Sequence, residues 1–113
     1  MGNKLKTLES KEKNQTCQIS FNDRSFLRNG KNYFVLSGEM HYFRIDADLW
    51  QLHLEKMKNA GLNTVSTYIP WSLHEQIEGK PDFSGKYGPN LNLERFIDLC
   101  NKMDMNLTVK PGP

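Results

Sequence analysis

The chain has 113 residues, with 15 basic and 13 acidic side chains, and 37% of its residues are apolar. This length fits one small domain or one part of a larger domain, and the composition is typical of a globular protein. A net charge of +2, without a dense basic tract beyond the first few residues, argues against binding to nucleic acid or to a membrane surface. No apolar run reaches the roughly 18 residues that a membrane span needs.

The first 16 residues form a polar leader that we expect to be disordered, and we expect residues 17–113 to form the folded part. The leader lacks the apolar core of a signal peptide, so we expect a cytoplasmic protein. In that compartment Cys17 and Cys100 are expected to be reduced thiols, although the sequence alone does not exclude a disulfide between them.

A β-hairpin is predicted around Asn29-Gly30, because this dipeptide supplies the positive φ angles of a type I′ turn. Its arms are residues 25–28 and 31–36. The second arm continues into residues 33–38, a nearly continuous apolar stretch of the kind found in strands that are buried on both faces.

The first helix is predicted between the aspartates at positions 46 and 48, either of which can cap it, and Gly61, which favours a helix end. Its apolar positions recur at i, i+4 and i+7: Trp50, Leu54 and Met57. A strand is predicted over residues 62–69, halted by Pro70, and is followed by a long loop over residues 71–90.

A second helix is predicted to start at Asn92, which can cap it. Two charged residues match the helix dipole in its first and last turns: Glu94 and Lys102. Its apolar face consists of Leu93, Phe96, Ile97, Cys100 and Met103. A third strand, predicted from the alternation of apolar and polar residues from position 105, ends at residues 111–113.

The order of elements is therefore a hairpin followed by β-α-β-α-β, which indicates an α/β protein with parallel strands. Such an order can begin either a doubly wound sheet or a (β/α)₈ barrel, and we expect the chain to be an incomplete portion of one of them. Because sites in these folds lie at the carboxyl ends of strands, the residues after the first two parallel strands are candidates. These are Glu39, His41, Tyr42, Arg44, Tyr68, Trp71, His74 and Glu75.

Glu39 and Glu75 could act as the two carboxylates of glycoside hydrolysis, or each could simply accept hydrogen bonds from nearby backbone or from Arg44. The aromatic residues near them suit a sugar-binding cleft but are equally compatible with ordinary packing. The three histidines, at positions 41, 53 and 74, lack the spacing of metal ligands, so we expect structural roles and no metal or other cofactor. Cys100 is expected to be a core residue and not a nucleophile.

Four segments resemble glycoside hydrolase family 35, the β-galactosidases: SGEMHYFRIDADLW (37–50), KNAGLNTVSTYIPWSLHE (58–75), PDFSGKYG (81–88) and VKPGP (109–113). The resemblance covers roughly residues 25–113. It implies the N-terminal portion of a (β/α)₈ TIM barrel and retaining hydrolysis of terminal non-reducing β-D-galactose by two glutamates, without a cofactor. In the family these glutamates follow the fourth and seventh strands. Both positions lie beyond Pro113, so the resemblance implies no catalytic residue in this chain, and we expect the isolated chain to be inactive.

By the same resemblance, Tyr68 matches a family tyrosine that contacts the galactose of the substrate. Glu39, His41, Arg44 and Glu75 match signature positions near the barrel mouth, where we expect supporting roles. The chain departs from the usual family residues at three positions: Ser66, Ser72 and Gln76. The alternatives to an enzyme segment are a non-catalytic sugar-binding α/β module and a gene remnant; an independent flavodoxin-like domain would not explain an end after the third strand.

Overall fold

The computed structural model describes residues 17–113, so the predicted disordered leader lies outside the described residues. Backbone contacts divide the chain into two compact units, with the boundary between Val35 and Leu36. The two units are described separately here. No helix among residues 17–113 is both long and apolar enough to cross a membrane.

The first unit contains a three-stranded antiparallel sheet in the order β1-β2-β3. The strands are β1 (Ile19–Phe21), β2 (Phe26–Arg28) and β3 (Lys31–Tyr33). The hairpin between β2 and β3 is confirmed, because the φ angles of Asn29 and Gly30 are 53° and 83°, as a type I′ turn requires. Strand β1 was not predicted, since three residues are too few to show a clear alternation.

The prediction of a doubly buried strand over residues 33–38 is wrong. Strand β3 ends at Tyr33, and the next strand, β4 (Ser37–Glu39), belongs to the second unit. Phe34 is 77% exposed. The apolar run is divided because its two ends pair in different ways, β3 antiparallel with β2 and β4 parallel with the strand that follows it.

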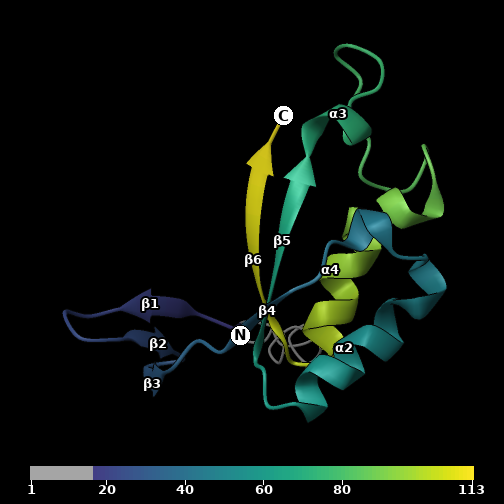
Figure 1. Cartoon of the computed structure of the whole chain (residues 1–113). Helices are drawn as coiled ribbons and strands as arrows, with labels where there is room; N and C mark the ends of the chain where they lie inside the picture. Colours follow the sequence, from purple (N-terminus) through teal and green to yellow (C-terminus); the bar gives the residue numbers. More distant parts are fainter. Residues whose placement is uncertain (1–16) are drawn as a thin grey trace, which may run out of the picture. The chain divides into compact units, whose positions relative to one another are not determined.

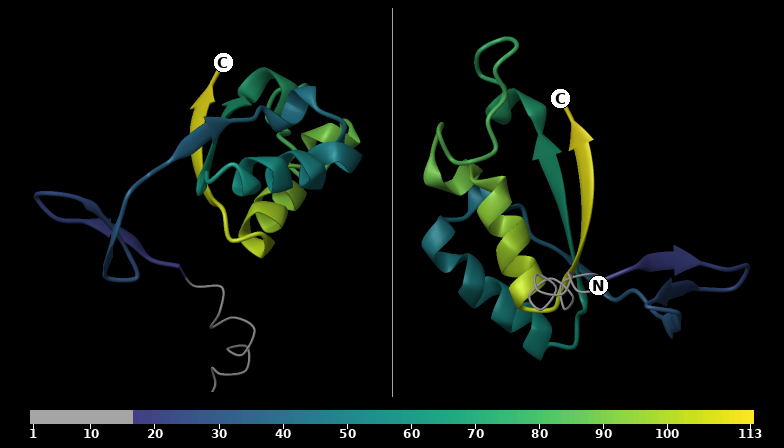
Figure 2. Two further views of the ribbon diagram at one scale, coloured as in Figure 1. Left: turned by 60° about the horizontal axis from the view of Figure 1, so that its bottom comes forward. Right: turned by 180° about the vertical axis from the view of Figure 1, so that it is seen from behind.

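The second unit is a parallel sheet in the order β4-β5-β6, with β5 (Thr64–Pro70) in the middle and β6 (Asn106–Gly112) beside it. Helices α2 (Trp50–Asn59) and α4 (Leu93–Lys102) connect the strands, and Figures 1 and 2 show both helices on the same side of the sheet. The predicted α/β class and parallel pairing are therefore confirmed. Two short elements follow β4, η2 (Tyr42–Arg44) and η3 (Ala47–Leu49), and two lie in the predicted long loop, α3 (Trp71–His74) and η4 (Pro89–Leu91).

The core of this unit lies between the sheet and the two helices. Trp50 is its largest fully buried side chain, and its indole N–H donates to the carbonyl oxygens of Tyr42 and Ile45, each at 3.1 Å. This satisfies the one polar group of a side chain whose burial contributes on the order of 2–3 kcal/mol. The other buried core residues are Met40, Tyr42, Ala47, Leu54, Val65, Leu93, Phe96, Cys100 and Met105.

The predicted aspartate cap of the first helix is wrong. Helix α2 begins at Trp50 directly after η3, and neither Asp46 nor Leu49, the residues before η3 and α2, makes a side-chain capping bond. The 3₁₀ turn supplies the partners instead, because the backbone N–H of Leu49 donates to Asp46 O and that of Trp50 to Ala47 O. At the other end of the helix Gly61 has a φ of 98°. A positive φ is common in the residue that follows a helix, and glycine adopts it easily.

The start of the second helix is confirmed, since the Asn92 side chain accepts the backbone N–H of Arg95 at 3.0 Å. Strand β5, in contrast, continues through Pro70 and passes directly into α3, where we expected a loop. Proline can end a strand in this way because it lacks only a donor, and Pro70 stays in register with Gly112 of β6.

Candidate functional site

Tyr68 lies near the carboxyl end of β5, at the position where this strand emerges from the core. The residues 64–67 before it are buried, whereas Tyr68 is 49% exposed. The ring of His41, which follows β4, stacks on Tyr68 with centroids 5.0 Å apart and planes at 12°. The Lys110 ammonium of β6 lies 5.4 Å from the ring centroid. Elements on both sides of β5 in the sheet therefore hold this tyrosine.

A hydrogen bond from the Tyr68 backbone favours one tautomer of the His41 ring. The Tyr68 backbone N–H donates to His41 Nδ1 at 3.4 Å. A nitrogen that accepts a hydrogen bond carries no proton, so the neutral ring has its proton on Nε2. The Thr67 hydroxyl, 3.5 Å from the same Nδ1, donates its own proton to Tyr68 O at 2.9 Å. His41 thus retains an N–H donor on Nε2.

Lys110 belongs to this site although we did not predict it. It stands opposite Tyr68 in the pairing of β5 with β6, and its Nζ lies 3.7 Å from Glu39 Oε2 at the end of β4. Glu39 therefore pairs with Lys110 and not with Arg44, which was one of the two kinds of partner that we considered for it. The sequence marks Lys110 as a polar position in an alternating strand and as part of the VKPGP segment. Neither signal shows its neighbours, because these depend on strand register.

A pocket of about 460 Å³ lies beside Tyr68 at the carboxyl ends of β5 and β6. It is lined by Phe43, Arg44, Tyr68, Ile69, Pro70, Lys110, Pro111, Gly112 and Pro113. A second pocket, of about 350 Å³, shares Arg44 with the first and also contains Glu39, His41 and His53. Of the five residues that the family resemblance singled out, four thus line one or the other of these two pockets, which share Arg44.

Glu75, the fifth predicted residue, lines neither of these pockets. Its carboxylate accepts the backbone N–H of Gly79 at 2.5 Å and the indole N–H of Trp71. These bonds, with that from Gly79 the stronger influence, lower the pKa of Glu75 from its ordinary value. Glu75 therefore stabilises its own loop by accepting hydrogen bonds, which is the second of the two roles considered for it in the sequence analysis.

A buried hydrogen-bonded chain lies beneath this loop, and sequence reasoning missed it. His74 is fully buried, its Nδ1–H donates to Asp82 O at 2.9 Å, and its Nε2 lies 2.7 Å from the hydroxyl of Tyr42. Since Nδ1 is the donor, Nε2 accepts from the tyrosine hydroxyl. Burial raises the pKa of Tyr42 to about 12. The chain ties the loop after α3 to η2, which carries Arg44.

Metal ligands and reactive thiols do not gather at the site. Residues 17–113 contain no cluster of three or more histidine, cysteine or acidic side chains that could hold a metal ion. Cys100 is 1% exposed, and burial raises the pKa of its thiol to about 12, as expected for a core residue. Neither cysteine is in a disulfide.

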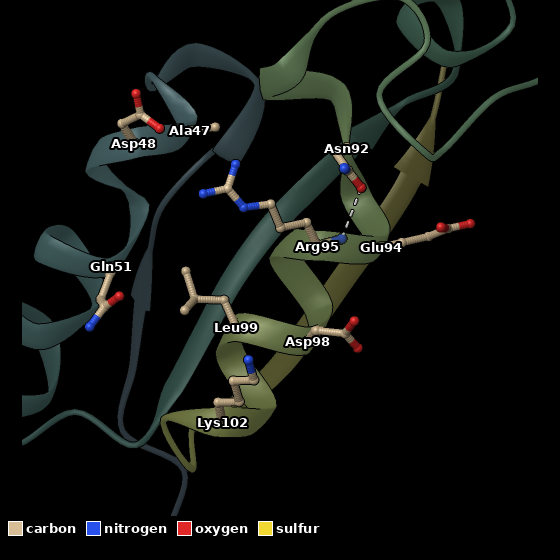
Figure 3. Close-up of a pocket in the computed structure, with 9 residues that line it drawn as sticks. All are labelled: Ala47, Asp48, Gln51, Asn92, Glu94, Arg95, Asp98, Leu99 and Lys102. Atoms are coloured by element: carbon tan, nitrogen blue, oxygen red, sulfur yellow. Dashed lines mark hydrogen bonds between the residues drawn. The ribbon is translucent and has the colours of Figure 1, made fainter.

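Figure 3 shows a larger groove, of about 530 Å³, between η3 and α2 on one side and α4 on the other. It contains none of the predicted site residues. The Arg95 side chain enters it and lies 5.6 Å from the centroid of the Trp50 ring, so it covers the core at this point. We therefore place the candidate site at the strand ends.

Comparison with known proteins gives a family match over most of the chain. Residues 25–113 match the family described as glycosyl hydrolases family 35. A beta-1,2-glucosyltransferase of Ignavibacterium album is 52% identical over 91 residues, which are 80% of this chain and 13% of that protein. An exo-beta-D-glucosaminidase of Thermococcus kodakarensis is 35% identical over 85% of this chain and 12% of its own length.

Proteins named beta-galactosidase are also similar to the chain. That of Bos taurus is 37% identical over 99 residues, which are 88% of this chain and 14% of the bovine protein. The chain thus spans about an eighth of the length of the curated relatives it matches.

Proposed function

This chain belongs to glycosyl hydrolases family 35, and from that membership we propose that it forms part of the sugar-binding mouth of a glycosidase. Its three parallel strands and two helices would be the N-terminal portion of a (β/α)₈ barrel, in which sites lie at the carboxyl ends of the strands. The proposed reaction of the complete protein is retaining hydrolysis of a terminal β-D-galactose.

One observation carries the proposal: Tyr68 is exposed beside the 460 Å³ pocket, and its ring is flanked by His41, which follows β4, and by Lys110 of β6. With His41 and Lys110 against the ring, its hydroxyl is the group left to meet a sugar hydroxyl. The resemblance assigns the two catalytic glutamates to strands beyond Pro113. This chain's own residues would therefore bind and orient the sugar, and the proton transfers would occur elsewhere in the barrel.

The test is the hydrolysis of 4-nitrophenyl β-D-galactoside by the complete protein, with the first-formed anomer identified by NMR. Tyr68→Phe should lower kcat/KM about 10- to 100-fold, because it removes one oriented hydrogen bond to the substrate. Tyr87→Phe is the matched control, since the Tyr87 hydroxyl donates to Lys80 O in the loop and lines neither pocket. An unchanged rate in Tyr68→Phe would overturn the assignment of the site.

Glucosyl transfer is a second candidate, because the relative named beta-1,2-glucosyltransferase is 52% identical to this chain, against 37% for the bovine beta-galactosidase. A glycosyl-enzyme intermediate can be captured by a sugar hydroxyl in place of water. Release of nitrophenol without an equal amount of free sugar, from a β-glucoside in the presence of a sugar acceptor, would favour transfer. Equal amounts would favour hydrolysis.

A sugar-binding module without catalysis predicts a different result. The chain of residues 1–113 would then melt cooperatively, and galactose would raise its melting temperature by mass action. A gene remnant would show neither behaviour.

A further inference from the structure

Where strand β4 ends, the side chain of His41 continues its pairing with β5. The main-chain bonds between the two strands reach as far as the one from Met40 N–H to Ser66 O, at 3.0 Å. Two residues further along β5, the N–H of Tyr68 faces the same edge of the strand. Because β4 ends at Glu39, this N–H donates to Nδ1 of His41 at 3.4 Å. The imidazole therefore holds the main chain of Tyr68 at a place where a strand carbonyl would otherwise do so.

The same imidazole also holds the side chain of Tyr68. The two rings are stacked, with centroids 5.0 Å apart and planes at 12°. The His41 ring lies 5.4 Å from the ring of Phe43, which in turn meets the fully buried Tyr42 ring edge-on at 5.3 Å. A continuous line of ring contacts thus joins the exposed Tyr68 to the core of this unit.

The position of His41 lets it act on a ligand through Tyr68. Strand β5 has a paired strand on each side, and His41 lines the 350 Å³ pocket and not the 460 Å³ pocket beside Tyr68. The Tyr68 hydroxyl stands at the far end of a residue that is 49% exposed. A small rotation of this side chain moves the oxygen by about 1 Å, which is enough to misplace an oriented contact with a substrate.

We propose that His41 is a positioning residue: its ring and its Nδ1 hold Tyr68 in the orientation in which the tyrosine hydroxyl meets the sugar. This inference rests on the proposed function and deepens it, because it names the residue that orients the sugar-binding tyrosine. The tautomer with its proton on Nε2 is the form that does so, since Nδ1 must accept the Tyr68 N–H.

Three substitutions of His41 in the complete protein separate the two contacts. His41→Phe keeps a ring for the stack and removes the acceptor, His41→Asn keeps an acceptor at the place of Nδ1 and removes the ring, and His41→Leu removes both. The measured quantity is kcat/KM for the 4-nitrophenyl β-glycoside that the complete protein hydrolyses best. His41→Leu should lower it roughly tenfold and each of the other two variants about threefold, because each of them retains one contact. Losses of equal size in all three variants would contradict the role of the two contacts.

The decisive measurement repeats the substitution without the Tyr68 hydroxyl. In a Tyr68→Phe background there is no hydroxyl to orient, so His41→Leu should change kcat/KM by less than about twofold. In the Tyr87→Phe background, the matched control, His41→Leu should keep its full effect. A merely structural role would lower the fraction of folded protein equally in every background, and a direct contact of His41 with the sugar would also persist in Tyr68→Phe. A full loss in the Tyr68→Phe background would therefore overturn the positioning role.

Failure of this inference and failure of the proposed function give different results. A complete protein that cleaves no β-glycoside, or a Tyr68→Phe variant with an unchanged rate, would contradict the proposed function itself. A rate that falls in Tyr68→Phe but not in His41→Leu would overturn only the positioning role of His41. If His41→Leu does not fold, His41→Phe and His41→Asn serve in the same comparison of backgrounds, since each retains one contact.

Discussion

The carboxyl end of β4 and the segment after β5 each carry a glutamate and a histidine, and the side chains are used in opposite ways. After β4, His41 lies against exposed Tyr68, and Glu39 forms an ion pair across the strand ends. After β5, His74 is fully buried, and Glu75 accepts hydrogen bonds from its own loop. The same two residue types therefore face a pocket at one strand end and not at the other. The difference lies in how deeply each histidine is buried and in which hydrogen-bond donors lie near each glutamate.

The comparison also explains why the loop after β5 can be long. Two of its three acidic side chains are satisfied locally, Glu75 by Gly79 and Trp71, and Asp82 by Ser84 and Lys86. The buried His74 then anchors the loop to the core through Tyr42. The segment after β4 needs no such bracing, because it forms the short helical turns η2 and η3.

The largest expected effect on stability comes from replacing the buried histidine, His74. His74→Ala should lower the free energy of unfolding by about 3–4 kcal/mol, because it leaves the Tyr42 hydroxyl without an acceptor, the Asp82 carbonyl without a donor, and a cavity. His41→Ala is the matched change at the exposed site and should cost about 1 kcal/mol. Urea unfolding of both variants measures the difference. Equal losses would contradict the distinction between the two histidines.

The next largest effect is the loss of stability at high pH, when the buried Tyr42 hydroxyl ionises. Burial favours the neutral phenol, so the pKa of Tyr42 is raised from 10 to about 12. Its contribution to stability is complete below pH 10 and is lost as the pH rises from 10 toward 12. Phenolate absorbance should show one of the four tyrosines titrating late, and Tyr42→Phe should remove that step. A titration in which all four tyrosines ionise together would contradict this prediction.

A smaller effect is expected where the loop after β5 ends. Asn92→Ala should lower the free energy of unfolding by about 1 kcal/mol, because the backbone N–H of Arg95 loses its capping acceptor. Asn92→Asp keeps the acceptor and should retain the stability. Thermal unfolding of the two variants checks this, and a loss of equal size in both would refute the capping role.

The smallest effect concerns the exposed carboxylates. The pKa of Glu75 is lowered from its ordinary value of 4.5, so its contribution to stability is present above pH 4.5 and is lost as the pH falls below it. Glu75→Gln should flatten the acid limb of the stability curve. The Gln substitution at Glu39, whose carboxylate faces Lys110 and not a backbone donor, serves as the comparison. An acid limb unchanged in Glu75→Gln would contradict the bracing role.

Much of the fold could be predicted because its signals are local. The turn at Asn29-Gly30, the cap at Asn92 and the end of α2 before Gly61 each depend on a few neighbouring residues. The division of the apolar run around Phe34 could not be predicted, because each part of that run pairs with a different sheet. The cap of α2 was missed since a preceding 3₁₀ turn replaced the side chain that we expected.

The part of the site that lies at the ends of consecutive strands could be predicted from the sequence. Tyr68, Glu39, His41 and Arg44 lie at strand ends, and the structure brings them to two pockets that share Arg44. Pairs that depend on register or on the packed core were not predictable. Lys110 meets Glu39 across 71 positions of sequence, and Tyr42 meets His74 across 32, so no local pattern marks either contact.

The burial of Cys100 gives the protein an internal reporter of its own opening. A thiol that is 1% exposed and has a pKa of about 12 reacts with an alkylating reagent only when the core around Phe96 and Met105 separates. The partly exposed Cys17, in the other unit, supplies an internal reference for the reagent. The rate at which Cys100 becomes labelled therefore counts the opening events of the helix-covered sheet, without any substitution or added probe.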